Sequence, residues 1–299
     1  MELSDEQEAQ PICWHFTVAY DGSAYSGWQV QTKLPTVQGE IRSRLRRMLR
    51  NPELKITGSS RTDAGVHALD QQVSFTAVMP PDIDLKLFPS RLNRWLPDDI
   101  VLKSAEIRKD DFNARFDNCG KAYTYCVSPA RKINPLFARY FWRTAFPLNV
   151  ERMREAAGYL QGEKDFVSFA SNPHRELDST VRNLRRLEVY EKDGMIYIVA
   201  VGDSFLYKMV RSLAGYLVHI GGGHAKPEDA LRVLAGRDRG LAEQSAPARG
   251  LFLAKVFFSP DEWKTYKPEL PPFAFHGMMT DANGEVLPGI CRNLKETND

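Results

Sequence analysis

The sequence predicts an α+β protein built from two similar halves, in which mainly antiparallel sheets are joined side by side. The chain has 299 residues, of which 43% are hydrophobic and 26% charged, so it can form one large or two smaller domains with a substantial core. Short alternating runs typical of strands are interspersed with segments of helical spacing. The order of helices and strands in the second half loosely echoes that in the first, although no sequence repeat is visible.

Changes in composition divide the chain into four parts. Residues 1–12 are acidic and polar, and they are expected to form a disordered extension. Residues 13–146 make up the first half and residues 147–258 the second half, which opens on a Pro-Leu-Asn stretch. Residues 259–299 are Pro-rich and polar, and they are expected to form a loosely packed C-terminal extension.

The first half begins with an alternating run at residues 13–20, which predicts a strand that Asp21 and Gly22 turn. Thr36 has the chemistry of an N-cap for a helix whose apolar side chains recur on one face, at Ile41, Leu45, Met48 and Leu49. The other segments predicted here are strands at residues 55–57, 72–78, 100–107 and 121–127, and a helix from about residue 85 to residue 96 that Pro97 bounds.

The second half opens with a helix in which Val150, Met153, Ala157 and Leu160 share a face and which Gly162 closes. Asp193-Gly194 joins two strands, at residues 183–192 and 195–201, into a hairpin. A largely buried helix follows over residues 206–220, with Arg211 off its apolar stripe. A short helix starting near Pro227 and a last strand at residues 251–258 complete this half.

Bulk composition excludes several classes of protein. The net charge is only +2, so it does not by itself indicate nucleic-acid binding. The four cysteines are scattered and His219 and His224 have no accompanying carboxylate or thiol, so we expect no metal site. The glycines at 221–223 lack the Lys-Ser or Lys-Thr of a phosphate loop. The polar N-terminus and the lack of a long apolar run predict a cytoplasmic protein with no membrane segment.

One carboxylate lies in a loop of small residues within GSSRTDAGVHALDQQVSF, at residues 58–75. Asp63 has Arg61 two residues before it and Gly65 two residues after it. Because most of the surrounding side chains are small, they would not block the approach of a large substrate. A nearby guanidinium favours the ionised carboxylate, and Asp63 is therefore expected to stay charged and nucleophilic. Thr-Asp-Ala-Gly is also good turn chemistry, so the local pattern alone leaves a purely structural turn open.

Positive charge is densest on the helix that follows Thr36. Because only Glu40 balances this face, it favours a polyanion contact over a plain solvated surface, with Arg42 and Arg46 as candidate RNA contacts. The basic side chains of the cluster are Arg42, Arg44, Arg46, Arg47 and Arg50.

Two groups of aromatic residues have two interpretations each. Tyr25 and Trp28 lie in a Gly/Ser loop, where they could stack on bases or pack on the domain's own surface. Tyr123 and Tyr125 project to one face of a predicted strand, which by itself is more typical of sheet packing than of chemistry.

An ordered set of motifs from about Val18 to Leu253 resembles the TruA-type tRNA pseudouridine synthases. The motifs are YDGSAYSGWQVQ, TVQGEI, SRTDAGVHA, DFNARF, KAYTY, DFVSF, FLYKMVRSLAG and APARGLFL. The resemblance implies the pseudouridine synthase fold, with helices on one face of the sheets and an RNA cleft between the halves. It also implies an isomerase that converts uridines at positions 38, 39 and 40 of the tRNA anticodon arm to pseudouridine, without a cofactor, as a homodimer.

Matching motif to motif, the resemblance implies roles for five residues. Asp63 matches the nucleophilic aspartate, and Arg61 matches an arginine that helps displace the target nucleotide from its stack. Tyr123 matches a tyrosine that packs on the uracil, and Arg211 matches an arginine paired to the aspartate. Leu251 matches an apolar wall of the pocket.

Departures from the family pattern concern Ser60, where glycine is usual, and Asp70, where a Gly-Gln pair is replaced by Asp-Gln. Asn113 stands where many members have histidine, and Arg249 also departs from the pattern. The tail after Ser259 exceeds the family's usual end.

Three alternatives remain at this point. A noncatalytic RNA-binding protein could use the same arginines, but it would not need Asp63. A hydrolase would need a second carboxylate, for which Asp70 is the only local candidate. An enzyme of the same family could also act on other RNA sites.

Overall fold

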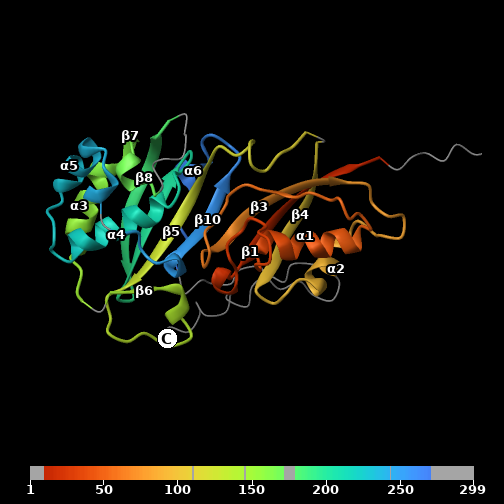
Figure 1. Cartoon of the computed structure of the whole chain (residues 1–299), viewed down its shortest axis with the longest axis horizontal. Coiled ribbons are helices and arrows are strands. Elements are labelled where there is room, and N and C mark those ends of the chain that lie inside the picture. The colour runs from red at the N-terminus through yellow and green to blue at the C-terminus, as the bar shows by residue number, and fades with distance from the viewer. Residues whose placement is uncertain (1–9, 110, 145, 172–178, 243, 271–299) are drawn as a thin grey trace, which may run out of the picture.

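The computed structural model describes residues 10–109, 111–144, 146–171, 179–242 and 244–270, and places their strands in one ten-stranded sheet (Figure 1). Neighbouring strands pair antiparallel except at two places, β3 with β10 and β5 with β6. From edge to edge the order is β4 (Ile100–Arg108), β1 (Ile12–Tyr20), β3 (His67–Ala77), β10 (Leu251–Phe257), β5 (Gly120–Ser128), β9 (Met195–Gly202), β8 (Val181–Lys192) and β7 (Gly162–Asp165), with β2 (Thr57–Gly58) paired to β3 and β6 (Trp142–Arg143) to β5.

The expected α+β fold with mainly antiparallel strands is confirmed, and the two expected sheets form a single continuous one. They meet where β10 runs parallel to β3, with Phe252 opposite His67 and Leu253 opposite Ala68. The last strand among the described residues, β10, is therefore inserted beside the strand that follows the Asp63 loop. This pairing fixes two segments that are about 185 positions apart in the sequence against each other.

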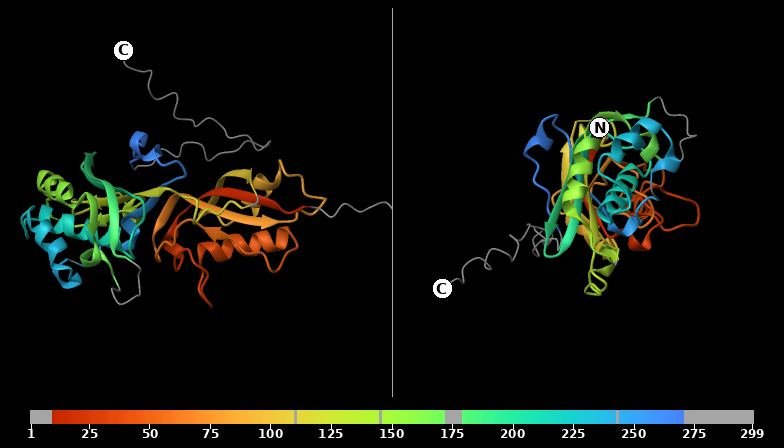
Figure 2. Two further views of the ribbon diagram at one scale, coloured as in Figure 1. Left: turned by 90° about the horizontal axis from the view of Figure 1, so that it is seen from above. Right: turned by 90° about the vertical axis from the view of Figure 1, so that its left-hand side faces the viewer.

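The α-helices of the described residues cover the sheet unevenly. In Figure 2 the orange helix α1 and the cyan helix α4 lie on the same side of the sheet, and the blue helix α6 lies on the opposite side. This arrangement agrees with the expectation of helices on one face, except for α6. The helices are α1 (Val37–Met48), α2 (Phe88–Trp95), α3 (Val150–Leu160), α4 (Met209–Gly221), α5 (Asp229–Gly236) and α6 (Glu262–Thr265).

Two hydrophobic cores lie under these helices, one in each half of the sheet. The first joins β1 and β3 to α1 and α2 through buried side chains that include Phe16, Ile41, Leu45, Val73 and Phe88. The second joins β5, β8 and β9 to α3 and α4 through buried side chains that include Met153, Leu160, Leu187, Ile198 and Leu213. Tyr123 of β5 packs against both cores, so it lies at their junction.

Local signals placed several elements correctly. The Thr36 hydroxyl accepts a hydrogen bond from the Gly39 amide at 3.3 Å, which confirms it as the N-cap of α1. Asp193 and Gly194 have φ of 54° and 72°, the left-handed conformations that a two-residue hairpin requires.

Other boundaries differ from the predictions. The strand expected at residues 55–57 is reduced to the two residues of β2, whereas β3 begins at His67, five residues before the expected start at residue 72. His67, Asp70 and Gln71 are buried polar residues at this start, and they interrupt the apolar alternation that the prediction relied on. The short strands β6 and β7 were not expected.

The beginning of the C-terminal extension is better packed than predicted. Trp263 and Tyr266 pack with Leu270 against Phe257 and the buried valines of the sheet. Burial of these large apolar side chains overrides the polar composition of the segment. Residues 271–299 and most of the predicted N-terminal extension lie outside the described residues. Within the described ranges, no helix combines the length and the apolar character that crossing a bilayer requires.

Candidate active site

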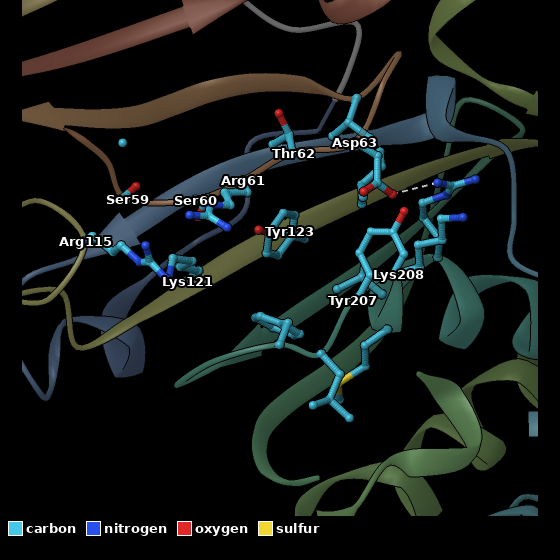
Figure 3. Close-up of a pocket in the computed structure, with 18 residues that line it drawn as sticks. Ser59, Ser60, Arg61, Thr62, Asp63, Arg115, Lys121, Tyr123, Tyr207 and Lys208 are labelled. Carbon is cyan, nitrogen blue, oxygen red and sulfur yellow. Dashed lines mark hydrogen bonds and ion pairs between the residues drawn. The ribbon is translucent and has the colours of Figure 1, made fainter. Parts of the chain in front are cut away.

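A cleft of about 390 Å³ lies where the two cores meet, between the Asp63 loop, the middle of β5 and the segment that leads into α4 (Figure 3). Residues from four distant parts of the chain therefore share one cavity. Its lining residues are Gly58, Ser59, Ser60, Arg61, Thr62, Asp63, Val66, Arg115, Lys121, Tyr123, Phe205, Leu206, Tyr207, Lys208, Met209, Val210, Arg211 and Leu251.

Asp63 forms an ion pair with Arg211 in this cleft. Arg211 Nη1 donates to Asp63 Oδ2 at 2.7 Å, and the two side chains are only 14% and 19% exposed, Arg211 being the more buried. Arg211 is itself held in place, because its Nε donates to the Ala246 carbonyl at 2.7 Å and its own carbonyl accepts from the Ala246 amide at 3.0 Å. A charge-assisted hydrogen bond between two fixed groups orients the carboxylate while leaving its other oxygen free of this contact.

Arg61 is not the partner of Asp63. It is exposed, and no hydrogen bond or ion pair joins it to Asp63 among the described residues. Figure 3 shows the Arg61 guanidinium on the Ser60 side of Tyr123, away from the Asp63 carboxylate. The two residues are separated by one position in the loop, and their side chains point apart. The expectation that Arg61 would supply the nearby positive charge is therefore wrong, and Arg211 supplies it.

The loop that carries Asp63 is braced by Gln71 of β3. Gln71 Oε1 accepts hydrogen bonds from the Ser59 hydroxyl at 2.9 Å and the Ser60 amide at 3.2 Å, while Nε2 donates to the Ser60 carbonyl at 2.8 Å. The buried Tyr20 hydroxyl lies 2.8 Å from Thr62 Oγ1. The catalytic candidate thus stands on a loop with little freedom. Neither Gln71 nor Tyr20 was singled out from the sequence.

Glycines occur around the loop because other parts of the chain approach their backbone closely. A Cβ on Gly58 would lie 2.5 Å from the Trp28 indole, and a Cβ on Gly27, where φ is +94°, would lie 2.6 Å from the Thr62 carbonyl. Trp28 is 1% exposed and Tyr25 8% exposed. Of the two interpretations of these aromatics, packing within the protein is the one that the structure supports.

Tyr123 and Leu251 give the cleft an apolar centre. Tyr123 meets Phe205 edge to face, with ring centroids 5.1 Å apart. Leu251, on the adjacent strand β10, is 6% exposed. Burial raises the pKa of Tyr123 to about 12, and the nearby Asp63 charge acts in the same direction, so its hydroxyl remains protonated at neutral pH.

Two cationic residues at one end of the cleft were missed. Arg115 lies within the DFNARF motif and Lys121 within KAYTY, so the motifs were recognised but these positions were not selected. Burial lowers the pKa of Lys121 to about 8, and the positive charge of Arg115 adds to the effect. On the other side, Lys208 lies with Nζ 5.0 Å from the centre of the half-exposed Tyr207 ring.

The departures from the family pattern have separate structural roles. Ser60 lines the cleft. Asp70 Oδ2 accepts from the Val256 amide at 2.8 Å and Asp70 is not among the residues that line the cleft, so it does not supply a second carboxylate there. Asn113 Oδ1 accepts from the Arg115 amide at 3.0 Å, and Arg249 Nε donates to the Phe141 carbonyl at 3.2 Å.

The basic helix α1 lies outside this cleft. Neither Arg42 nor Arg46 lines it, and Arg46 Nε donates to the Leu54 carbonyl at 3.0 Å, which ties it to its own domain. Arg44 pairs with Glu40 one turn earlier, as the charge spacing predicted. Arg47 and Arg50 line a second hollow with the exposed Trp95.

No group of three or more His, Cys, Asp or Glu side chains in the described part of the chain is close enough to hold a metal ion.

Comparison with known proteins identifies the family. A family model described as tRNA pseudouridine synthase matches residues 17–117 and 156–259. The tRNA pseudouridine synthase A of Pseudothermotoga lettingae is 42% identical over 81% of this chain and 97% of its own length. The enzymes of the same name from Bacillus pumilus and Ruminiclostridium cellulolyticum are 40% and 38% identical, over 81% of this chain and 97% and 98% of their lengths.

Similarity to solved structures is weaker. The archaeal box H/ACA sRNP Nop10-Cbf5 complex contains a chain that overlaps with 69% of this one and 44% of its own length, at 13% identity and a TM-score of 0.30. The sequence similarities decide the assignment: they extend through both halves of the chain, and the segments matched by the family model contain the Asp63 loop, the start of α4 and β10. The chain therefore belongs to the tRNA pseudouridine synthase family of isomerases.

Proposed function

We propose that this protein isomerises uridine to pseudouridine in the anticodon arm of tRNA, at positions 38, 39 and 40, with Asp63 as the nucleophile on a flipped-out uridine. The observation that carries the proposal is the Asp63–Arg211 ion pair, 2.7 Å long, in the cleft beside Tyr123 and Leu251. The curated relatives named above are tRNA pseudouridine synthases A, which supports tRNA as the substrate. A tRNA substrate also agrees with the cytoplasmic location expected from the sequence.

The reaction requires a nucleophile and a confined space. The N1 glycosidic bond of uridine breaks, the uracil turns, and a bond forms between its C5 and the same sugar carbon, while a proton leaves C5 and one is gained at N1. No atoms are added to or removed from the nucleotide overall. An Asp63 carboxylate held by Arg211 can attack either the uracil ring or the sugar carbon, and it is restored when the new bond forms.

The shape and polarity of the cleft suit an extruded base. A uracil placed beside Tyr123 would have the apolar side chains of Phe205 and Leu251 around it and the Asp63 carboxylate at its edge. Extrusion of a paired base costs a few kcal/mol of stacking and pairing. Stacking on an aromatic ring contributes about 1–3 kcal/mol per base, so Tyr123 can offset much of that cost. We assign Arg61, which is exposed at the cleft, to displacement of the target nucleotide.

Three further assignments belong to this proposal. We divide the chain into halves at residues 13–146 and 147–258, flanked by extensions at residues 1–12 and 259–299.

We propose a homodimer, which gel filtration with light scattering would detect; a monomer that modifies tRNA would refute it. We also propose that Arg42 and Arg46 on α1 contact the tRNA outside the catalytic cleft.

The test uses the purified full chain and unmodified tRNA labelled at uridine. The wild-type protein is expected to produce pseudouridine in the anticodon arm, and chemical mapping of the product identifies the positions. Asp63→Ala is expected to bind the same tRNA and to convert none of it. Asp98→Ala, which removes an exposed carboxylate far along the chain from the loop, is the matched control and is expected to retain conversion.

The outcomes separate the alternatives. Undiminished conversion by Asp63→Ala would refute its role as the nucleophile. Tight binding without conversion by the wild type would favour a noncatalytic RNA-binding protein. Conversion confined to uridines outside the anticodon arm would leave the chemistry intact and correct the proposed positions.

A further inference from the structure

We propose that Lys121 and Arg115 form a phosphate-binding site at one end of the cleft, which holds an RNA backbone phosphate next to the extruded uridine. The inference rests on the proposed function and deepens it, since it assigns the part of the substrate that this end of the cleft recognises.

The charges of the cleft are distributed unequally. Asp63 is the one carboxylate among the residues that line it, and Arg211 already pairs with this group. Arg61, Arg115 and Lys121 gather on the opposite side of Tyr123 from the Asp63–Arg211 pair (Figure 3). Among the described residues, none of these three side chains has an acidic partner within ion-pair distance. An anion from outside the protein is therefore the complement that this end lacks.

Lys121 is the most informative member of the group. It is partly buried on β5, and its neighbours across the adjacent strands are the uncharged Gly202 and Val256. Placing an ammonium group there without a counter-ion is unfavourable, because burial removes water and Arg115 adds a second positive charge. A bound phosphate would supply both the missing charge and strong hydrogen-bond acceptors.

The position of Lys121 relative to Tyr123 fits one nucleotide. The two residues are separated by one position on β5, so their side chains leave the same face of the sheet. Alternate residues on a strand are about 7 Å apart. This spacing is comparable with the distance between the base and the phosphate of one nucleotide. A base beside Tyr123 therefore places its backbone phosphates within reach of the cationic end.

Arg115 is held at the edge of the same end by its own loop. The Asn113 side chain accepts from the Arg115 amide at 3.0 Å, and the Asn118 side chain donates to the Arg115 carbonyl at 2.7 Å. The loop is anchored to the sheet because the fully buried Ala114 donates its amide to Ser74 Oγ at 3.0 Å. The backbone of Arg115 is thus fixed while its exposed guanidinium is available to an RNA strand.

The first experiment measures the dissociation constant of unmodified tRNA at several KCl concentrations. Lys121→Met and Arg115→Gln are each expected to weaken binding several-fold at 0.15 M salt and to make the plot of log K against log salt shallower by about 0.7–0.9, the value for one lost phosphate contact. Lys121→Arg keeps the charge and is expected to retain the wild-type slope. Lys192→Gln removes an exposed charge in the β8–β9 hairpin and is the control with an unchanged slope.

The second experiment identifies the phosphate. An anticodon stem-loop RNA carries one neutral methylphosphonate, placed either 5′ or 3′ of the target uridine. If Lys121 binds that phosphate, the losses in affinity caused by the methylphosphonate and by Lys121→Met are expected to be strongly non-additive. Wild-type slopes for Lys121→Met and Arg115→Gln, or additive losses at both phosphates, would overturn the proposal. Pseudouridine formation by the wild type is scored separately, so failure of the proposed function is distinguishable from failure of this one.

Discussion

Replacement of Lys121 by methionine is expected to stabilise the folded protein at neutral pH while it weakens RNA binding. Burial and the Arg115 charge lower the pKa of this lysine from 10.5 to about 8. Each factor of ten in proton affinity is worth about 1.4 kcal/mol, so keeping Lys121 charged in the free protein costs about 3 kcal/mol. Methionine keeps an apolar stem and has no charge to desolvate. We therefore expect a gain of about 1–3 kcal/mol in the free energy of unfolding.

The stability difference between Lys121→Met and the wild type is expected to depend on pH. Below pH 8 the lysine is charged in both states and the wild type bears the full cost. Between pH 8 and 10.5 the folded lysine loses its proton while the unfolded one keeps it, so the stability of the wild type rises relative to that of the variant. The advantage of Lys121→Met is therefore largest at pH 7 and falls above pH 8.

Urea denaturation of both proteins at pH 7 and at pH 9.5, without RNA, measures this difference. Lys121→Arg, which remains charged at both pH values, is the matched comparison and is expected to show no such gain. A Lys121→Met variant that is less stable than wild type at pH 7, or an advantage that does not change with pH, would refute the account of Lys121 as a charge without a counter-ion.

Two further substitutions test the support of the site. Gln71→Leu removes the three hydrogen bonds that brace the Asp63 loop, and it is expected to lower the rate of conversion by about 10²-fold with little change in tRNA affinity; an unchanged rate would show that the loop is positioned by other contacts. Asp70→Ala leaves the Val256 amide without its acceptor, and thermal denaturation should show a loss of about 1–3 kcal/mol, whereas Asp70→Asn keeps an acceptor and should recover most of it. Activity of the folded Asp70→Ala protein should persist, because Asp70 does not line the cleft.

Much of the secondary structure followed from local chemistry. The N-cap at Thr36, the turn at Asp193-Gly194 and the apolar stripe of α4 each depend on residues a few positions apart, and each was predicted correctly. The start of β3 was missed because its buried polar residues are satisfied by partners distant in the sequence. One such pair joins His67, through its ring, to the Arg249 carbonyl 182 positions later.

The candidate site shows the same division. The sequence by itself determined that Asp63 lies in an accessible loop of small residues, and the resemblance of its motifs implied the pairing with Arg211. Local spacing pointed instead to Arg61, since it cannot report which way two side chains in one loop point.

Only the tertiary structure decided which charges meet. Asp63 and Arg211 are 148 positions apart, and they come together because β10 and α4 pack beside the loop that precedes β3. The same packing joined the two sheets into one and turned Asp70 toward a strand amide. It also left Lys121 and Arg115 facing each other without an acidic partner among the described residues. Ion pairing and desolvation depend on distance in space and on the exclusion of water, which the order of residues along a chain does not specify.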